Sequence, residues 1–328
     1  MISILNWNGL NNTLLCLRSL DQSEFRDFDV LVIDNGSKDD PSKQIATLHP
    51  DVCVVRNATN NGFASGHNQG IEHAGKNGYE FVWILNNDTV LKPTVLGELV
   101  AALDADPEVG MVTPIIVNDD ATGSIQFCGC ELDPVGGRFV HFALVEQALE
   151  AQRQRPALFC IWGTAILART QLLARIGGFD AKFFAYYEDL DLSVRVSQAG
   201  YANRIVPSAR VQHGGANDPD QRPPHYVYFN TRNRLLFWRK HSRGVAWFRR
   251  CCQLLAGALI YAGEWHERGQ HAKGHAAKLA IVDGMLGRGG PWDPTRTAPH
   301  AGFRVLLRHP YFFARVLRSR VLGGTPGA

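Results

Sequence analysis

Three carboxylates stand within four residues in the second half of the chain, directly after a run of aromatic residues. Residues 183–187 read Phe-Phe-Ala-Tyr-Tyr, and Glu188, Asp189 and Asp191 follow. We expect Glu188 and Asp189 to lie at a helix N-terminus, where the helix dipole favours ionised carboxylates. A carboxylate held there beside aromatic walls is suited to remove a proton as a general base. Simple capping of the helix is the alternative, although a cap needs one acidic residue and not three.

Candidate metal ligands follow an apolar run at residues 81–86. Asn86 and Asp88 are separated by one residue, so both side chains face the same side of an extended chain. Hard oxygen ligands of this kind suit Mg²⁺ or Mn²⁺, which bridge a diphosphate and keep several waters. His213 follows another expected strand, and its imidazole is a candidate to complete a metal site with Asp88. For Asp88 and His213, each taken alone, a structural role is the alternative.

A further carboxylate, Asp34, ends the apolar run at residues 30–34 and precedes Asn35-Gly36-Ser37. A carboxylate at the end of a strand and before a glycine turn is well placed to accept hydrogen bonds from a nucleobase or a ribose. The same pattern is also typical of an aspartate that caps a helix or a turn.

Small residues cluster after the third expected strand, with glycines at positions 62, 66 and 70. This spacing differs from the dinucleotide-binding fingerprint and from a Walker A loop. Close approach of a nucleotide sugar to the backbone would still need small residues here. A plain loop that leads into a helix is the alternative.

The elements that must position these groups alternate in type over the first hundred residues. The expected strands are 2–7, 30–34, 52–56 and 81–86, and the expected helices are 10–20, 41–48, 64–74 and 93–103. This order predicts a parallel sheet with helices on both faces. In such sheets the ligand crevice lies at the carboxyl ends of the strands, where the polar clusters of this half fall.

The next section is less regular. We expect a strand at 110–117, a polar stretch to about Gly137, an apolar strand at 159–169, helices at 171–175 and 188–199, and a strand at 201–206 that ends before Pro207. From residue 226 onward the pattern is helical, with Arg interleaved among Leu, Phe and Trp. These residues predict a helical C-terminal region.

Charge divides the chain into two parts. Hydrophobic residues make up 45% and charged residues 20% of the 328 residues, which excludes a disordered chain. Residues 1–228 carry 17 Lys and Arg against 27 Asp and Glu, whereas residues 229–328 carry 17 against 4. Basic amphipathic helices, including one expected at 303–322 with Arg304 and Arg308, are typical of contact with an anionic membrane. A helical subdomain packed on the core is the alternative, and no nucleic-acid-binding motif is present.

Together, these pieces resemble the family 2 glycosyltransferases with the GT-A fold, in particular the bacterial rhamnosyltransferase-like branch. The matching residues run in order from near the N-terminus to about residue 240. They are Asn6-Trp7-Asn8-Gly9, Val32-Ile33-Asp34-Asn35-Gly36-Ser37, Asn61-Gly62-Phe63-Ala64, Asn68-Gln69-Gly70, Leu85-Asn86-Asn87-Asp88-Thr89, Gly163-Thr164-Ala165, Gly177-Gly178-Phe179-Asp180, Glu188-Asp189-Leu190-Asp191-Leu192 with Arg195, His213, and Arg232-Asn233-Arg234. Many short motifs in one order are far more specific than any single motif.

The resemblance implies a donor site. Asp34 would contact the nucleoside. The other residues expected to bind the nucleotide sugar are Asn6, Asn8, Asn35, Asn61, Gly62, Asn68, Asn86 and Asn87. Asp88 would be the metal-binding aspartate of the family's DXD element, with Asn86 at its first acidic position. His213 would be a further ligand of Mg²⁺ or Mn²⁺.

The resemblance also implies a mechanism. Asp189 looks like the catalytic base that deprotonates the acceptor hydroxyl, and Glu188 or Asp191 would orient it or bind the acceptor. Trp162 and Gly163 would line the acceptor pocket. A single displacement would then invert the anomeric centre while the metal ion neutralises charge on the leaving diphosphate.

We therefore expect an α/β protein with the GT-A fold, a Rossmann-like and mostly parallel sheet flanked by helices, and a C-terminal helical extension. Residues 1–110 would bind the nucleotide sugar, residues 111–225 would bind the acceptor and supply the base, and residues 226–328 would form the basic helical region.

The expected function is inverting transfer of rhamnose or a similar sugar from a TDP- or UDP-linked donor to a glycan or polyprenyl-diphosphate-linked acceptor in bacterial surface glycan synthesis. We expect a cytoplasmic enzyme that is peripheral on the inner face of the plasma membrane. We expect no nucleic-acid partner, and the sequence is compatible with a homo-oligomer. A non-catalytic binding module for nucleotide sugars or glycans, or a nucleotidyltransferase on a similar sheet, is the alternative.

Overall fold

A computed structural model describes residues 1–214, 221–296 and 309–320, without the side chains of 318–320. The chain divides into two compact units, each described here by itself. One unit comprises Met1–Asp180 with Glu188–Gly215, and the other comprises Ala181–Tyr187 with Ala216–Ala328. The expected functional division of residues 1–225 at about residue 110 stays a prediction.

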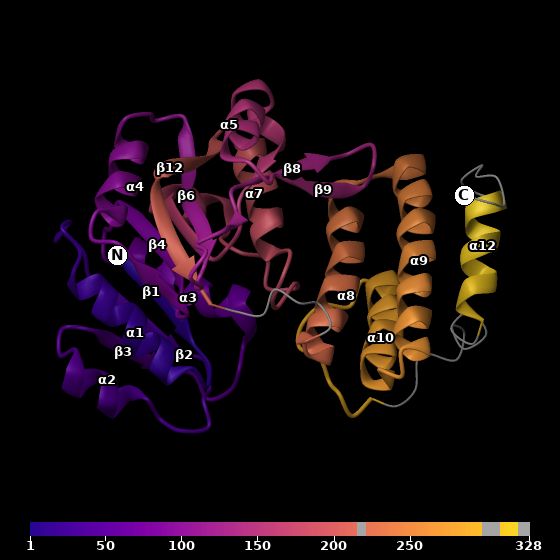
Figure 1. Ribbon diagram of the computed structural model, residues 1–328, viewed down its shortest axis with the longest axis horizontal. Helices are drawn as coiled ribbons and strands as arrows, with labels where there is room; N and C mark the ends of the chain where they lie inside the picture. Colours follow the sequence, from indigo (N-terminus) through magenta and orange to yellow (C-terminus); the bar gives the residue numbers. More distant parts are fainter. Residues whose placement is uncertain (215–220, 297–308, 321–328) are drawn as a thin grey trace. The chain divides into compact units, whose positions relative to one another are not determined.

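A mixed sheet forms the centre of the first unit, and within the described residues it has nine strands in the order β3-β2-β1-β4-β11-β6-β12-β5, with β7 paired to β6 (Figure 1). The bounds are β1 Ile2–Asn6, β2 Val30–Asp34, β3 Cys53–Arg56, β4 Phe81–Asn86, β5 Thr89–Leu91, β6 Val109–Asn118, β7 Ile125–Phe127, β11 Ala165–Arg169 and β12 Ala202–His213. Parallel pairs join β3, β2, β1 and β4, and a further parallel pair joins β6 to β12. Six of the nine described strands run in one direction, which confirms the predicted mostly parallel sheet in this sense, while β5, β7 and β11 run the other way and make the sheet mixed. β11 lies between the two parallel parts.

Helices cover both faces of this sheet because the connections reverse direction at β1. The chain moves outward from β1 to β2 and β3, and then returns past β1 to β4. Right-handed crossovers therefore place α3 on the face opposite α1 and α2. The helices of this unit are α1 Leu10–Asp21, α2 Ser42–Leu48, α3 Gly62–Lys76, α4 Val95–Asp104, α5 Val145–Gln154, α6 Thr170–Ile176 and α7 Glu188–Gln198, with a 3₁₀ turn at Pro156–Leu158. Since both faces are covered, β2 and the first nine residues of β6 are buried throughout.

The reversal creates the crevice in which α/β proteins bind ligands. β1 lies between β2 and β4, and the three strands end at Asn6, Asp34 and Asn86. Two helices that leave neighbouring parallel strands on opposite faces cannot both cover the strand ends. The polar residues that follow β1, β2 and β4 therefore meet at one open edge.

The apolar run at 159–169 is not one strand, as the sequence predicted, but two. Phe159–Cys160 (β10) joins a small second sheet with β8 Cys130–Asp133 and β9 Arg138–His141, and β11 then enters the main sheet. The turn between β10 and β11 contains Gly163. The stretch between Asn118 and Gly137, expected to be irregular, therefore holds short strands of both sheets.

The strand expected at 201–206 does not end before Pro207. β12 continues to His213 through an irregularity in its pairing with β6 between Val206 and Arg210. A proline has no N–H to give to a ladder, and such an irregularity leaves it unpaired without ending the strand. The continuation matters because it carries His213 to the carboxyl end of the sheet.

The second unit is helical, which confirms the predicted C-terminal helical extension. Its described helices are α8 Pro224–His241, α9 Gly244–Glu267, α10 His271–Leu286 and α12 Pro310–Arg320. The helix expected at 303–322 corresponds to α12, while Arg304 and Arg308 lie outside the described residues. None of the helices within the described ranges is both long and apolar enough to span a bilayer.

Candidate functional site

Asn6, at the end of β1, is the hub that holds the strand ends together. Its side-chain N–H groups donate to Asp34 Oδ1 at 2.8 Å and to Ser37 Oγ at 3.2 Å. Its side-chain oxygen, Oδ1, accepts hydrogen bonds from Thr13 Oγ1 at 3.0 Å and from the backbone N–H of Gly9 at 3.3 Å. Asn6 is fully buried, so it fixes the geometry of the edge and presents no atom to solvent.

Asp34 has the same character, although the sequence suggests a contact with the nucleoside. Its carboxylate accepts hydrogen bonds from Asn6 and Ser37 and forms an ion pair with Arg56 Nε at 3.2 Å. The side chain of Asp34 is 0% exposed, whereas that of Arg56 is 38% exposed and also binds Asp40 at 2.8 Å. The group that reaches the open edge is therefore the guanidinium of Arg56, which Asp34 holds in place.

Asn35 organises the loop that leads into α3. Its side-chain N–H groups donate to Asn60 Oδ1 at 3.0 Å and to Gly62 O at 3.1 Å. Its side-chain oxygen, Oδ1, accepts hydrogen bonds from Asn57 Nδ2 and from the backbone N–H of Asn61, both at 3.1 Å. The backbone N–H of Gly62 is itself bound by Asn60 at 2.8 Å, and Asn61 remains exposed at the turn.

Asn8 and Asn87 complete the edge. Asn8 takes a left-handed backbone with φ of 53°, and it exchanges hydrogen bonds with Ser37 and Lys38 while its side chain stays exposed. Asn87 follows β4, and its side-chain N–H groups donate to Thr13 Oγ1 at 3.0 Å and to Gly9 O at 3.2 Å. This asparagine ties the end of β4 to the start of α1.

The expected metal ligands do converge. His213, the last residue of β12, places its Nε2 at 3.2 Å from Asp88 Oδ1 and at 3.2 Å from Asn86 Nδ2. Backbone pairing supports this arrangement, since His213 lies opposite Thr89 of β5 and the N–H of Gly214 donates to Asp88 O at 2.9 Å. The side chains of His213 and Asp88 are 17% and 30% exposed, so both reach solvent.

Gln126 of β7, which the sequence did not single out, sets the tautomer of His213. The Nε2 group of Gln126 donates to Asn118 Oδ1 at 3.1 Å, so its carbonyl oxygen faces His213 Nδ1 at 2.6 Å. That oxygen can only accept, so Nδ1 carries a proton, and in the neutral imidazole the lone pair then lies on Nε2, which faces Asp88. An imidazole held in this way is oriented as a metal ligand.

Asp189, the second residue of α7, is held by backbone donors. Its Oδ2 accepts a hydrogen bond from the N–H of Gly163 at 2.8 Å, and its Oδ1 accepts one from Leu190 N at 2.8 Å. Burial raises the pKa of Asp189 above the usual 3.8, and the two backbone hydrogen bonds oppose that rise. A carboxylate of raised pKa is a stronger proton acceptor than a free aspartate.

The space around position 163 is tight for any side chain. A Cβ atom there would lie 3.1 Å from the ring of Phe63 and 3.4 Å from the Cβ of Asp189. The absence of a side chain lets the backbone N–H approach the carboxylate directly. The resemblance names Gly163 without explaining it, and this contact supplies the physical reason.

Glu188 is buried, with 4% of its surface exposed, and its Oε2 has no hydrogen-bond partner in the described structure. Burial raises its pKa well above the usual 4.5, and the neighbouring charge of Asp189 raises it further. Burial therefore favours the protonated form of Glu188 more strongly than that of Asp189, whose pKa the backbone hydrogen bonds hold down. One negative charge on the pair is easier to bury than two.

Asp191 does not reach the open edge. It is fully buried, and its carboxylate binds Arg195 Nε at 2.7 Å. Arg195 continues to the carbonyl oxygens of Ile176 and Gly178, at 2.9 Å and 2.6 Å. Asp191 and Arg195 lie four residues apart on one face of α7, and their ion pair ties α7 to the turn after α6.

Trp162 lies in an aromatic cluster next to Gly163. Its ring stacks on Phe127 of β7, with centroids 4.1 Å apart and planes 9° apart. His141 of β9 meets the edge of the same ring at a centroid distance of 5.4 Å. The turn that holds Trp162 is thus packed between β7 of the main sheet and β9 of the small second sheet, and its next residue, Gly163, holds Asp189.

Backbone hydrogen bonds join the metal-ligand cluster to Asp189. The N–H of Asn86 donates to the carbonyl oxygen of Thr164 at 2.9 Å. Thr164 directly follows Gly163, whose N–H holds Asp189. The side chain of Asn86 in turn contacts His213. The two expected functional groups therefore belong to one contiguous region of the first unit.

Asn68 and His67 of α3 are structural in this arrangement. The side chain of Asn68, expected to bind donor, exchanges two hydrogen bonds of 2.8 Å with the backbone of Phe179. His67, which the sequence did not single out, is fully buried beside Phe63 and lies 3.1 Å from Ser3 Oγ. Burial lowers the pKa of His67 to about 3, so this imidazole is neutral.

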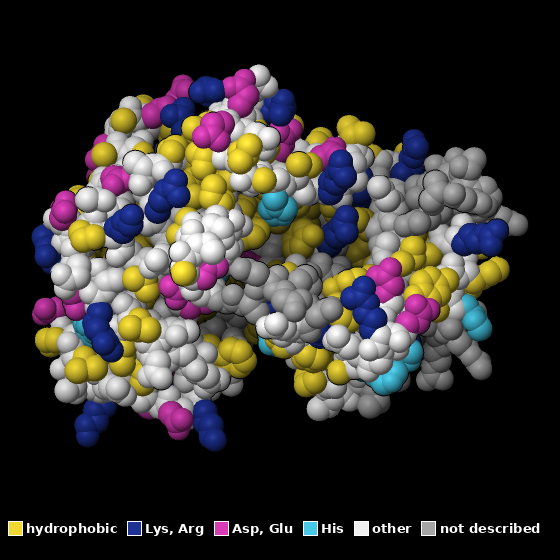
Figure 2. All heavy atoms as spheres, viewed as in Figure 1, with side chains coloured by type: hydrophobic (Ala, Val, Ile, Leu, Met, Phe, Trp, Pro, Cys, Tyr) yellow, Lys and Arg dark blue, Asp and Glu magenta, His cyan; other side chains and the backbone are white. Residues whose placement is uncertain are grey.

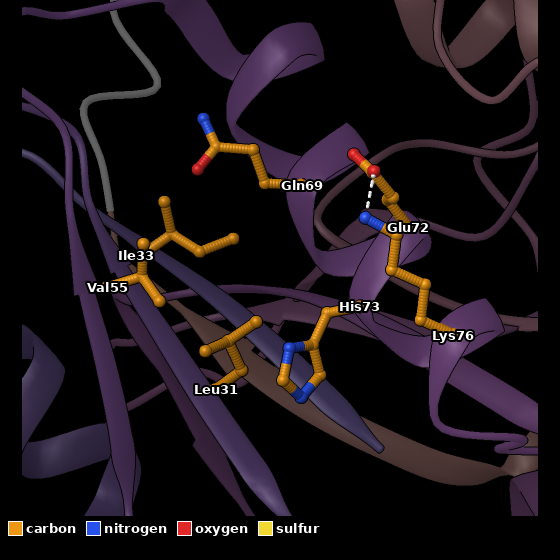
Figure 3. A pocket seen from close by; sticks show the side chains of 7 residues that line it. All are labelled: Leu31, Ile33, Val55, Gln69, Glu72, His73 and Lys76. Carbon is orange, nitrogen blue, oxygen red and sulfur yellow. Dashed lines mark ion pairs between the residues drawn. The ribbon is translucent and has the colours of Figure 1, made fainter.

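A separate hollow of about 200 Å³ lies between α3 and the strands β2 and β3 (Figure 3). Leu31, Ile33 and Val55 line its apolar side, and the ion pair between Glu72 and Lys76 lies on its rim, together with His73 and Gln69. None of the residues that converge near Asp88 or Asp189 lines this hollow. We assign it no part in the site.

Comparisons with known proteins identify a family. The model of the family described as Glycosyl transferase family 2 matches residues 2–177. A curated relative from Mycobacterium tuberculosis, an N-acetylglucosaminyl-diphospho-decaprenol L-rhamnosyltransferase, is 26% identical over 288 residues. The match covers 82% of this chain and 92% of that protein.

Solved structures agree on the fold. The mannosyltransferase PcManGT from Pyrobaculum calidifontis, in complex with GDP-Man and Mn²⁺, superposes with a TM-score of 0.55 at 15% identity and covers 98% of this chain and 86% of that one. GalNAc-T7 with UDP, GalNAc and Mn²⁺ superposes with a TM-score of 0.55 at 16% identity and covers 75% of this chain and 52% of that one. The predicted GT-A fold is confirmed by these likenesses.

The raised pKa of Glu188 predicts a specific dependence of stability on pH. Between the usual value of 4.5 and the higher pKa of the folded state, the folded protein keeps a proton that the unfolded chain has lost. The free energy of unfolding therefore falls in this range by about 1.4 kcal/mol per pH unit on account of Glu188. Glu188→Gln removes this dependence, so the variant gains stability relative to the native protein as the pH rises from 5 to 8.

Urea unfolding at several pH values measures this gain, and Glu146→Gln at an exposed position of α5 is the control. A difference between Glu188→Gln and native protein that does not change with pH would show that Glu188 is ionised in the folded state.

Proposed function

The chain belongs to glycosyl transferase family 2, and we propose that it transfers rhamnose or a similar sugar from a nucleoside-diphosphate donor to a saccharide acceptor in bacterial surface glycan synthesis. The match to the mycobacterial relative covers most of both chains. The name of that relative supports L-rhamnose as the sugar and a polyprenyl-diphosphate-linked saccharide as the acceptor. The observation that carries this proposal is the contiguous set of Asp88, His213 and Asp189 at the carboxyl edge of the sheet.

The donor site would lie at the open ends of β1, β2 and β4. The buried hydrogen bonds of Asn6, Asp34, Asn35 and Asn87 give the edge a fixed shape. A TDP- or UDP-linked sugar would then contact groups that are exposed at this edge. These include the side chains of Asn8 and Asn61 and the guanidinium of Arg56. We thus assign Asp34 an indirect role in binding the nucleoside, through Arg56.

Asp88 and His213 would hold Mg²⁺ or Mn²⁺, with the amide of Asn86 beside them. Their ligand atoms are 3.2 Å apart, which suits neighbouring ligands of one octahedral ion, about 3 Å apart. In the described part of the chain no group of three His, Cys, Asp or Glu residues is arranged for a metal ion. Two protein ligands are typical of an ion whose other positions are taken by substrate phosphates and water. When bound, the ion supplies positive charge against the diphosphate.

Asp189 would act as the base for a single displacement. The acceptor hydroxyl oxygen attacks the anomeric carbon, its proton passes to the carboxylate of Asp189, and the bond from that carbon to the diphosphate breaks. One displacement inverts the anomeric centre, and no carboxylate nucleophile is needed. The N–H groups of Gly163 and Leu190 keep the carboxylate in one orientation before and after it takes the proton.

The neighbours of Asp189 divide into two groups. We assign Trp162 and Gly163 to the acceptor side, because the aromatic cluster of Trp162 offers a flat apolar surface next to the base. Glu188 and Asp191 would act through position and charge. Protonated Glu188 leaves Asp189 as the ionised partner, and Asp191 anchors α7 through Arg195.

The second unit would hold the enzyme against an anionic membrane, on the cytoplasmic face, where a polyprenyl-linked acceptor is reached. Residues 221–263 contain eight Lys and Arg and no Asp or Glu. At the start of α9, Val245 and Phe248 are 76% and 60% exposed, with Arg243 and Arg249 exposed beside them. In Figure 2 dark blue basic side chains lie among hydrophobic ones over the helices of the second unit, with magenta acidic and cyan histidine side chains also in view. Exposed apolar side chains flanked by cations are typical of a membrane interface.

Replacement of the base should separate binding from chemistry. Asp189→Asn should lower kcat by about 10³-fold, within the range for loss of a general base, because an amide cannot take the acceptor proton. The affinity for the nucleotide sugar, measured by calorimetry with Mn²⁺, should stay within about twofold, since the donor and metal groups are intact.

Asp104→Asn at the exposed end of α4 is the control and should be fully active. Full turnover by Asp189→Asn would exclude Asp189 as the base, and a complete lack of transfer by the native enzyme over a panel of sugar donors would favour a binding module.

The membrane contact is testable by sedimentation with vesicles. Native protein should bind vesicles that contain anionic phosphatidylglycerol and not neutral phosphatidylcholine vesicles. Val245→Ser with Phe248→Ser should weaken this binding about tenfold or more, because two exposed apolar side chains no longer enter the interface. Val135→Ser, which alters an 88% exposed valine of the first unit, is the matched control. Equal binding by the double variant and the native protein would contradict the proposed surface.

A further inference from the structure

The segment before the proposed base has an unusual backbone. Phe184, Tyr186 and Tyr187 have φ values of 67°, 68° and 74°, in the left-handed region that favours glycine. In the described ranges Asn8 is the one other non-glycine residue with a positive φ. Bulky residues persist in this conformation only where their surroundings impose it. Something must therefore hold residues 183–187, and Glu188 and Asp189 follow at once in the chain.

Two side chains of α8 hold the carbonyl groups of this segment. Asn233 Nδ2 lies 2.9 Å from Phe183 O, 2.7 Å from Ala185 O and 2.7 Å from Tyr186 O. Arg232 Nη2 donates to Phe183 O at 2.8 Å and to Lys182 O at 3.3 Å.

Arg232 and Asn233 are themselves fixed. Arg232 Nε donates to Asn233 Oδ1 at 2.8 Å, which settles the orientation of the amide and turns its N–H groups toward the segment. Both residues are fully buried. A buried guanidinium and a buried amide are costly to leave without partners, so they favour the one backbone shape that offers these carbonyl groups.

The rings of the segment pack on the same helix. Phe184 stacks on Phe229, with centroids 5.1 Å apart and planes 11° apart. Tyr186 meets the edge of Tyr226 at 5.0 Å, and the ring of Tyr187 lies 6.1 Å from that of Phe237.

Positions 226, 229, 233 and 237 follow the three- and four-residue spacing of one helix face. That single face of α8 therefore receives both the carbonyl groups and the rings of the segment.

The other side of the segment is also supported within the second unit. Arg232 Nη1 donates to the carbonyl oxygen of Gly290, and the N–H of Gly290 donates to Lys182 O at 3.0 Å. A Cβ atom at Gly289 would lie 2.6 Å from Lys182 O, so the backbone passes there at close range. Residues 182–187 are thus enclosed between α8 and the turn after α10.

We propose that Arg232 and Asn233 are positioning residues for the base, and this inference rests on the proposed function of Asp189. By holding residues 183–187, with Phe184, Tyr186 and Tyr187 in the left-handed region, they determine where α7 begins and which way its first two side chains point. The carboxylate of Asp189 can then meet the N–H groups of Gly163 and Leu190, which keep its pKa from rising further. Neither Arg232 nor Asn233 needs to touch a substrate for this role.

The test replaces the amide of Asn233. Asn233→Ala should lower kcat about tenfold or more while the KM for the nucleotide sugar stays within about twofold, because a displaced base slows chemistry and not donor binding. The acid limb of the pH–kcat profile should move to higher pH, since a displaced Asp189 loses backbone donors that lower its pKa.

Asn230→Ala is the matched control. Asn230 also lies on α8, and its side chain bonds to Tyr226 O within that helix. An unchanged kcat in Asn233→Ala, or equal losses in both variants, would overturn the proposal. Asn233→Gln, which moves the amide by one methylene group, serves the same comparison if Asn233→Ala does not fold.

A second comparison isolates the backbone conformation. Tyr187→Gly and Tyr187→Ala remove the same ring, but only glycine accepts a positive φ without strain. In the Asn233→Ala background, the Gly variant should keep several times the kcat of the Ala variant, and the difference should be smaller when Asn233 is present. Equal activity of the two variants in both backgrounds would contradict a role for the left-handed segment.

Hydrogen exchange separates this inference from the proposed function. Without any substrate, the amides of residues 183–190 should exchange faster in Asn233→Ala than in native protein or Asn230→Ala. If they do and the native enzyme transfers no sugar, the positioning of the segment stands and the proposed function fails. If the exchange of these amides is unchanged in Asn233→Ala, Asn233 does not hold the segment, and the proposed positioning role is wrong whatever the activity.

Discussion

The antiparallel pairing of β11 with β4 is the constraint on which the rest of the site depends. β4 ends with Asn86 and leads to the metal-ligand side, while β11 begins just after the turn that holds Gly163. Because the two strands run in opposite directions, the end of one lies beside the start of the other, and the N–H of Asn86 meets the carbonyl oxygen of Thr164 at 2.9 Å. A parallel strand in this place would begin at the far edge of the sheet. The inserted antiparallel strand thus brings Gly163, which holds the proposed base Asp189, to the edge where the parallel strands end.

Buried asparagines determine how that edge can work. Parallel strands end with backbone groups and turns that need partners, and an asparagine offers donors and an acceptor in one short side chain. Asn6 binds groups of separate segments, residues 9–13 and 34–37, and Asn35 binds four groups of the loop at residues 57–62. Their side-chain hydrogen bonds are made inside the protein, so they shape the proposed donor site without facing it. The groups that remain accessible, such as Asp88 and His213, are few and well oriented.

The first half of the sheet and the edge that carries the candidate site were predictable from the sequence, because strong local signals agree with the fold. Apolar runs ended by polar residues fixed the first four strands to within a residue or two, and chain order placed Asp34 and Asp88 at one edge. Other features depend on distant partners. Nothing local shows that the 159–169 run breaks at Gly163, since the residues around it are as apolar as a strand. The continuation of β12 past Pro207 depends on an irregular pairing with β6, and Gln126 gains its role only through the tautomer of His213.

The central claim is that one displacement, with Asp189 as base and the Asp88–His213 pair on the diphosphate side, moves the sugar. The most direct measurement is the anomeric configuration of the product, determined by NMR after reaction of TDP-rhamnose and Mn²⁺ with a polyprenyl-diphosphate-linked N-acetylglucosamine acceptor. The account predicts a configuration opposite to that of the donor. Retention of the donor's configuration would require a second displacement or a different mechanism, and would contradict it.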